Sequence, residues 1–338
     1  MNSTMAWPPQ AGDRTPLRLS IIIVTWNVRR HVLDCLQSIG RCPLCDAFEV
    51  IVVDNASTDG TVDAVRRDSP HVTVLANEKN RGFAAASNQG IAESRGQYLL
   101  LLNPDTIVHP HSLDTLRSFM DSHPDVGVCG PRLLNGDGTI QASARRFPTF
   151  RATLHHYTIF RHLRIFQPRY QSWVMADFPH DNQRDVDQLM GSALLLRRAA
   201  VAQVGPMDER FFMYFEEVDL CYRLRQAGWR IVFLPDAIIT HLGGRSSRQT
   251  PVAARMMMLG SLLRYFRKHR GPVVTGFFNC LFKPAVIARE VFDLLVGSVT
   301  YAASLLARNA TRRARSAAKI KNAAILLGKY SWWLVFKA

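Results

Sequence analysis

The last quarter of the sequence is almost without acidic residues. Residues 251–338 hold two Asp and Glu against 15 Lys and Arg, whereas residues 1–250 hold 25 against 27. Because the larger part is close to neutral, the sequence argues against a nucleic acid as the partner. A tail that is both basic and apolar is instead typical of a segment that lies on an anionic membrane surface.

Long hydrophobic runs are missing as well. The first 18 residues, which we expect to be disordered, have no apolar core of the kind a secretory signal needs, so we expect the body of the protein to be cytoplasmic. In the tail, the longest uncharged run, Leu294 to Ala307, has 14 residues, fewer than the roughly 18 of a membrane span. We therefore expect residues 251–338 to form amphipathic helices peripheral to the inner face of the cell membrane, with a helical cap packed on the body as the alternative.

Two further absences concern cysteine and glycine. The one close cysteine pair, Cys42 and Cys45, has no second pair with which to complete a zinc site. Neither a Gly-x-Gly-x-x-Gly pattern nor a phosphate loop with Lys and Ser or Thr is present, which argues against dehydrogenases and P-loop enzymes. A nucleotide site in this chain therefore has to use carboxylates, a cation and backbone groups.

Short apolar runs alternate with helical patterns through the body, which we take as residues 19–250. This alternation indicates βαβ units, so we expect an α/β fold with a mainly parallel central sheet, followed by a helical extension over residues 251–338. Strands are expected at Leu19–Thr25, Phe48–Val53, Val72–Leu75, from Leu99, at Val126–Leu134, Leu189–Leu196 and Ile231–Leu234.

The stretch from Ala144 to about Gln183 interrupts this pattern. It is basic and aromatic and contains three prolines, at positions 148, 168 and 179. It is either an excursion that faces an acceptor substrate or a set of surface loops with a short helix.

Asp105 follows the Leu99 strand directly, in the turn Asn103-Pro104-Asp105. In an open α/β sheet, ligands bind in the crevice beyond the carboxyl ends of the strands. Asp105 is therefore a candidate ligand of a metal or a phosphate site, and an ordinary turn is the alternative.

Two other groups of residues have the chemistry of a site. Glu216 and Glu217 fall near a helix N-terminus after several aromatic residues. They either cap the helix, or a partly dry wall raises the pKa of one of them so that it acts as a general base. His241, followed by two glycines and Arg245, is either structural or a ligand for a cation such as Mn²⁺ beside an anion site.

Taken in order, these motifs resemble the inverting glycosyltransferases of family 2, which have the GT-A fold. The resemblance covers about residues 19–247 and is nearest to a bacterial rhamnosyltransferase-like branch. It rests on Thr25-Trp-Asn27, Asp54-Asn55-Ala-Ser-Thr-Asp59, Asn80-Arg-Gly82-Phe83, Asn103-Pro-Asp105, Gly191-Ser192, Phe212-Met-Tyr-Phe-Glu216-Glu217-Val-Asp219 and His241-Leu-Gly-Gly.

The resemblance implies an enzyme that moves a sugar from a nucleotide-diphosphate donor to a hydroxyl of a lipid-linked or cell-envelope glycan. L-Rhamnose from dTDP-rhamnose is the first choice of donor, and a polyprenyl-linked glycan is the expected acceptor. A transferase that uses a UDP-sugar and a nucleotidyltransferase are the alternatives.

The resemblance also implies roles for individual residues. Glu217 is the expected catalytic base, with Glu216 as the alternative, and Asp105 and His241 are expected to hold Mg²⁺ or Mn²⁺. Asn103 stands where the family has the first Asp of its Asp-x-Asp motif, which leaves one carboxylate for the cation. Asp219 and Arg245 are expected elsewhere in the active site, and the nucleotide site is expected to comprise Thr25, Asn27, Asp54, Asn55, Asn80, Gly82, Phe83 and Asn103.

Overall fold

The computed structural model describes residues 17–42, 47–244, 249–307 and 309–336, which fall into two compact units. The first unit runs up to Phe147 and includes Phe178–Gln249, and the second combines Pro148–Asp177 with the residues from Thr250 onward. The stretch from Ala144 to Gln183 is therefore divided between the two units.

The segment that we expect to be disordered is described only at its end. Residues 1–16 lie outside the described residues. Leu17 is buried, and Arg18 forms an ion pair with Asp121 at 2.6 Å. These last two residues are therefore packed on the first unit.

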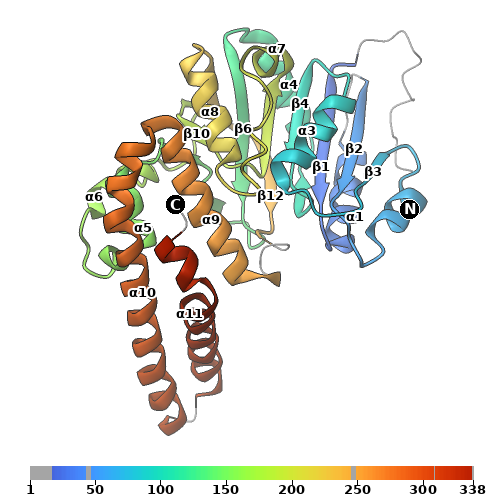
Figure 1. Ribbon diagram of the computed structural model, residues 1–338. Coiled ribbons are helices and arrows are strands. Elements are labelled where there is room, and N and C mark those ends of the chain that lie inside the picture. Colours follow the sequence, from blue (N-terminus) through green and yellow to red (C-terminus); the bar gives the residue numbers. More distant parts are fainter. Residues whose placement is uncertain (1–16, 43–46, 245–248, 308, 337–338) are drawn as a thin grey trace. The chain divides into compact units, whose positions relative to one another are not determined.

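The first unit is built around one β-sheet (Figure 1). Its main strands are β1 (Leu19–Thr25), β2 (Phe48–Asp54), β3 (Thr73–Ala76), β4 (Tyr98–Leu102), β5 (Thr106–Val108), β6 (Val126–Leu134), β11 (Ala193–Arg197) and β12 (Arg230–His241). They lie in the order β3-β2-β1-β4-β11-β6-β12-β5. The first four are parallel, which confirms the expected arrangement for this half, whereas β11 and β5 run antiparallel to their neighbours.

Four short strands complete the pairing. Two of them, β7 (Ile140–Gln141) and β9 (Arg184–Asp185), join this sheet, while β8 (Ala144–Arg145) and β10 (Gln188–Leu189) pair with each other. Because β11 is antiparallel to both β4 and β6, and β12 is parallel to β6, the carboxyl end of β12 lies at the same edge as those of β1, β2 and β4.

Helices cover the sheet because each has an apolar face at helical spacing. In α1, Val32, Leu36 and Ile39 are fully buried. The close fit of α3 depends on Gly90, since a Cβ there would lie 2.4 Å from Cγ2 of Ile22. The helices of this unit are α1 (Arg29–Gly40), α2 (Thr61–Asp68), α3 (Phe83–Glu93), α4 (Ser112–Ser122), α7 (Arg198–Val204) and α8 (Glu216–Gln226).

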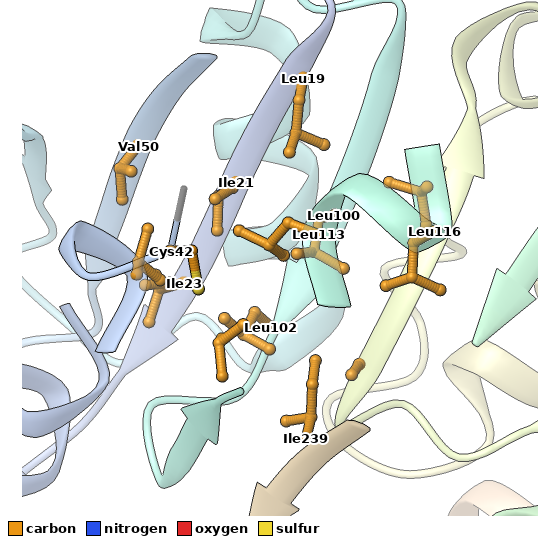
Figure 2. Packing of buried hydrophobic residues seen from close by; sticks show 14 of the residues in the cluster. Leu19, Ile21, Ile23, Cys42, Val50, Leu100, Leu102, Leu113, Leu116 and Ile239 are labelled. Carbon is orange, nitrogen blue, oxygen red and sulfur yellow. The ribbon is translucent and has the colours of Figure 1, made fainter. Parts of the chain in front are cut away.

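The core lies between the sheet and these helices. Figure 2 shows Ile21 and Ile23 of β1 beside Leu100 and Leu102 of β4, in a cluster that also contains Leu113 of α4. Alternate residues of each strand enter this cluster because side chains of a strand point to opposite faces in turn. The strand ends, with their polar residues, are thereby fixed in position.

Two strands differ from the expected bounds by more than one residue. The run Leu189–Leu196 is interrupted at residues 190–192, where the amide of Met190 donates to the carbonyl of Ser143. The strand expected at Ile231–Leu234 continues to His241, because a register shift between Leu234 and Ile238 absorbs the intervening proline. His241 is therefore the last residue of a strand.

The second unit is helical. It consists of α5 (Phe150–Tyr157), the short 3₁₀ helix η1 (Ile159–Arg161), α6 (Gln167–Trp173), α9 (Pro251–Arg270), α10 (Pro272–Leu306) and α11 (Ala310–Phe336). Figure 1 shows α10 and α11 as long neighbouring helices. Over the residues described, no helix combines the length and the apolar character that crossing a bilayer requires.

Candidate active site

Two buried side chains, each with one oxygen that has no hydrogen-bond partner, lie at the ends of β1 and β2. Thr25 and Asp54 are neighbours in the register of β1 and β2, and both are 1% exposed. Asp54 Oδ2 accepts a hydrogen bond from the amide of Ser57 at 2.8 Å, but Asp54 Oδ1 and Thr25 Oγ1 have none. Since buried polar atoms are normally paired, these two atoms are candidates to bind a polar ligand.

Two asparagines shape the loops beside them. Asn27, in a left-handed conformation with φ +51°, accepts a hydrogen bond from the amide of Thr58 at 2.7 Å. Asn55 donates to the carbonyl of Gly82 at 3.1 Å and accepts from the amide of Arg81 at 3.3 Å. The loops that follow β1, β2 and β3 are thus held to one another at the edge of the sheet.

The turn before α3 is joined to the segment before α8. Asn80 accepts a hydrogen bond from the amide of Gly82 at 2.9 Å, and Phe83, the first residue of α3, donates its amide to the carbonyl of Phe212 at 2.7 Å. A Cβ on Gly82 would lie 2.4 Å from that carbonyl oxygen, and its φ is +85°. Only glycine allows this close approach of the two backbones.

Asp105 and His241 come together at the same edge. His241, at the end of β12, is opposite Thr106 in β5. Its Nε2 lies 3.4 Å from Asp105 Oδ1 and 3.4 Å from the side-chain nitrogen Nδ2 of Asn103. The side chains of His241 and Asp105 are 9% and 6% exposed. The structure therefore brings the two expected cation ligands side by side, with Asn103 next to them.

A glutamine that the sequence analysis missed orients His241. Gln141 Oε1 lies 2.7 Å from His241 Nδ1, while its amide nitrogen donates to Asn135 at 2.8 Å. This arrangement places the proton on Nδ1 and leaves the Nε2 lone pair directed toward Asp105, as in a metal-binding histidine. No local pattern marks Gln141, because it lies 100 positions before His241 in the chain.

The donor set of Asp105 and His241 suits a hard or intermediate divalent cation such as Mg²⁺ or Mn²⁺. Among the described residues, no group of three or more His, Cys, Asp or Glu is arranged to hold a metal ion. Two protein ligands fit a cation whose remaining positions are filled by oxygens of a bound diphosphate and by water.

The paired glutamates begin α8, as expected. Tyr214 and Phe215 just before them have φ of +71° and +68°, a conformation that is strained for aromatic residues. Glu216 is buried and Glu217 is partly exposed, and neither Oε2 atom has a hydrogen-bond partner. Strained backbone and unpaired carboxylate oxygens together are typical of a functional site.

The two glutamates differ in their surroundings. Burial raises the pKa of Glu216 well above its ordinary value, and the charge of Glu217 raises it further. Burial also raises the pKa of Glu217, but backbone N–H groups at the start of α8 and the nearby charge of Arg145 oppose the rise. Glu217 is therefore the carboxyl that ionises more readily. Arg145 is a second residue that the sequence analysis did not identify.

A series of contacts connects Glu217 with the cation ligands. A Cβ on Gly191 would lie 3.5 Å from the Glu217 side chain, and the carbonyl of the next residue, Ser192, accepts the amide of Asn103 at 2.9 Å. Asn103 in turn contacts His241. The short segment between β10 and β11 thus lies between Glu217 and the candidate cation site.

Asp219 stands apart from this group. Asp219 is fully buried in an ion pair with Arg223 at 2.8 Å, and Arg223 donates to the carbonyls of Val204 and Gly205. This contact anchors α8 to the end of α7. Arg245 lies outside the described residues.

Comparison with known proteins identifies the family of the chain. The model of Glycosyl transferase family 2 matches residues 20–182. An N-acetylglucosaminyl-diphospho-decaprenol L-rhamnosyltransferase of Mycobacterium tuberculosis is 34% identical over 250 residues, which are 70% of this chain and 79% of that protein. The chain belongs to the family 2 glycosyltransferases. Within them this glycosyltransferase falls in the rhamnosyltransferase-like branch, and it is an enzyme.

Other relatives of this glycosyltransferase are more distant. The low-salt glycan biosynthesis hexosyltransferase Agl10 of Haloferax volcanii is 26% identical over 212 residues, 62% of each chain. A mannosyltransferase of Pyrobaculum calidifontis, solved with GDP-Man and Mn²⁺, is 17% identical with a TM-score of 0.53, and the match covers 94% of this chain and 90% of that one. This likeness supports the GT-A fold.

Proposed function

We propose that this glycosyltransferase transfers L-rhamnose from dTDP-L-rhamnose to a hydroxyl of an N-acetylglucosamine carried on a polyprenyl diphosphate, in the synthesis of a cell-envelope glycan. The relative named a rhamnosyltransferase of such an acceptor, at 34% identity, supports this choice of donor and acceptor. The observation that carries the proposal is the line of contacts from Glu217 through Gly191 and Asn103 to His241. It sets a base and a cation site on the two sides of one short segment.

In the proposed donor site, the unpaired oxygens of Asp54 and Thr25 bind the base and ribose of the nucleotide. Asn27, Asn55, Asn80 and Gly82 hold the loops around them. Phe83, at the start of α3, packs against the apolar cluster of Val24, Ile51, Val53 and Ala86. Asn103, which contacts His241, is proposed to complete the nucleotide site on the side of the cation ligands.

Asp105 and His241 would hold Mg²⁺ or Mn²⁺ together with the diphosphate of the donor. When bound, the cation neutralises negative charge that develops on the departing diphosphate. Gln141 keeps His241 in the tautomer that this role requires. Because the protein supplies two ligands, the site is expected to fill only together with the nucleotide.

Glu217 is the proposed general base. Its carboxylate takes the proton of the acceptor hydroxyl while that oxygen attacks C1 of the sugar and the C1–O bond to the diphosphate breaks. The bond forms on the face opposite to the one that breaks, so the configuration at C1 is inverted. Glu216 lies beside it, and burial raises its pKa more strongly than that of Glu217.

The two parts of the chain have different proposed tasks. Residues 19–250 hold the catalytic residues, and the basic, apolar residues 251–338 associate with the inner face of the cell membrane, where a lipid-linked acceptor is present. The protein is therefore proposed to be peripheral to the membrane on its cytoplasmic side.

A transfer assay tests this function. The full chain is incubated with Mn²⁺, a short-chain polyprenyl diphosphate carrying N-acetylglucosamine, and either dTDP-L-rhamnose or a set of UDP-sugars. We expect rhamnosylated acceptor and free dTDP. Transfer with release of UDP would overturn the proposed donor, and release of pyrophosphate would overturn sugar transfer altogether.

A further inference from the structure

Helix α10 exposes an apolar side to solvent. Its buried residues are both apolar, such as Phe278, Phe282 and Val286, and polar, such as Glu290 and Asp293, whereas its large exposed side chains are all apolar. A helix that faces water normally exposes its polar side and buries its apolar side. The exposed side of α10 is therefore suited to an apolar environment.

All of these exposed side chains except Leu305 form one stripe. Phe277 is 76% exposed, Leu295 61% and Val299 70%. At 100° per residue the members of the stripe fall within an arc of about 100°, and they extend over about 50 Å of helix. None of the charged residues of α10, all of which are described, falls within this arc. We call this set the α10 face: Val273, Val274, Phe277, Leu281, Val291, Phe292, Leu295, Val299 and Leu306.

The acidic residues of this region are turned away from the α10 face. Glu290 forms an ion pair with Arg255 of α9. Asp293 pairs with Lys319 of α11 at 2.8 Å, and His162 lies 3.7 Å from the same oxygen. These contacts fix the polar side of α10 against its neighbours in the second unit.

The charges that remain exposed on these helices are positive. Glu290 and Asp293 are the two acidic residues of 251–338, and both are buried. The exposed charged side chains on α9, and on α11 as far as its side chains are described, are Arg264, Arg267, Lys268, Arg270, Arg312, Arg313, Arg315 and Lys321. An apolar face flanked by positive charges is complementary to a surface whose outer layer is anionic and whose inner layer is apolar.

We propose that the α10 face docks on an anionic lipid bilayer, with α10 in the plane of the membrane and its apolar side chains at the boundary of headgroups and acyl chains. The basic residues of α9 and α11 attract the anionic headgroups, and the α10 face contributes apolar burial. A second copy of the chain fits the α10 face less well, because it would bring two positive helical regions together. The proposed function supplies the reason for such docking, namely a lipid-linked acceptor.

Vesicle co-sedimentation of the full chain tests the proposal. The probes are vesicles of phosphatidylcholine with phosphatidylglycerol, and vesicles of phosphatidylcholine alone. We expect Phe277→Ser/Leu295→Ser/Val299→Ser to lower the apparent affinity for anionic vesicles at least about tenfold, since three exposed apolar side chains lose their burial. Binding is also expected to weaken with neutral vesicles and at 1 M salt, where the Debye length falls to about 3 Å.

Two control variants show whether the loss is specific. Ile140→Ser removes an apolar side chain that is 46% exposed in the first unit, and it is expected to bind like the wild type. Phe277→Leu/Leu295→Ile/Val299→Ile keeps the apolar character and is expected to retain binding, whereas loss of binding in this variant would contradict the proposal. Circular dichroism confirms that each variant keeps its helices.

Wild-type binding by the serine variant would overturn the proposal, as would a wild type that ignores anionic vesicles. If the wild type instead forms a dimer that the serine variant dissociates, the α10 face belongs to a second copy. Donor and acceptor are absent from this experiment, so its failure leaves sugar transfer to be judged by the transfer assay.

Discussion

At the scale of single residues, two adjacent carboxyl groups differ in how strongly burial raises their pKa. Glu216 is buried and carries the more strongly raised pKa, whereas Glu217 is partly exposed and lies near Arg145. A general base has to be deprotonated before it reacts. The two residues should therefore respond differently to the same substitution.

Glu217→Gln is expected to keep nucleotide affinity and lower turnover at least about 100-fold, the low end for general-base catalysis. Glu216→Gln is the matched control. It replaces a carboxyl whose pKa is raised by burial with a neutral group of similar shape, and should leave turnover close to that of the wild type. Steady-state transfer and calorimetric binding of dTDP check both. The reverse ranking of the two variants would assign the base to Glu216.

The raised pKa of Glu216 also predicts that the stability of the fold depends on pH. Because its folded pKa lies above the ordinary 4.5, the folded state holds a proton that the unfolded state has released. Its contribution to stability therefore falls as the pH rises from about 4.5 to the raised pKa. Glu216→Gln should raise the melting temperature by an amount that grows over this range and then levels off. A constant difference at all pH values would contradict the raised pKa.

The cation site makes a third prediction at this scale. With Asp105 and His241 as its protein ligands, the wild type should bind Mn²⁺ at least about fivefold more tightly when dTDP is present. Asp105→Ala should abolish this difference, and Asp236→Ala, which removes an exposed carboxylate from β12, should not. Calorimetric titration with Mn²⁺, with and without dTDP, measures the Mn²⁺ affinity of each variant. Equal Mn²⁺ affinity in both states would show that the cation does not depend on the nucleotide.

At the scale of elements, the contact between Gly82 and Phe212 links the donor loop to the start of α8. Gly82→Ala combines a strained φ with a backbone clash, whereas Gly138→Ala, at φ +83°, meets nothing within 4 Å. Gly138→Ala, the control, should lower the unfolding free energy by about 1–2 kcal/mol, and Gly82→Ala should lower it by about 1–3 kcal/mol more. Urea unfolding measures the difference. Equal costs would mean that the two segments can move apart freely.

The parallel elements were predictable from the sequence because their cause is local. Leu19–Thr25 and Val126–Leu134 are runs of strand length, and both are strands with those bounds. The interruption at residues 190–192 and the continuation of β12 through Pro235 were not predictable, since each depends on pairing with distant segments. Long-range pairing overrides local propensity at such positions.

The candidate site shows the same division at the scale of the whole molecule. The strand pattern predicted that Asp54 and Asp105 would lie at one edge of the sheet, because parallel strands share their carboxyl ends, and the resemblance to the family implied that His241 would join Asp105. Gln141 and Arg145 could not be predicted, since their roles arise only from contacts made after folding. The apolar face that α10 exposes likewise becomes visible only when the packing of the helix is known.

In the proposed mechanism, Glu217 and the cation site act on opposite sides of the donor sugar in a single displacement. The anomeric configuration of the transferred sugar, determined by NMR of the product formed by the full chain, tests this mechanism. We expect a configuration opposite to that of the donor and no covalent glycosyl-enzyme. A product with the donor's configuration, or a trapped glycosyl-enzyme, would contradict it.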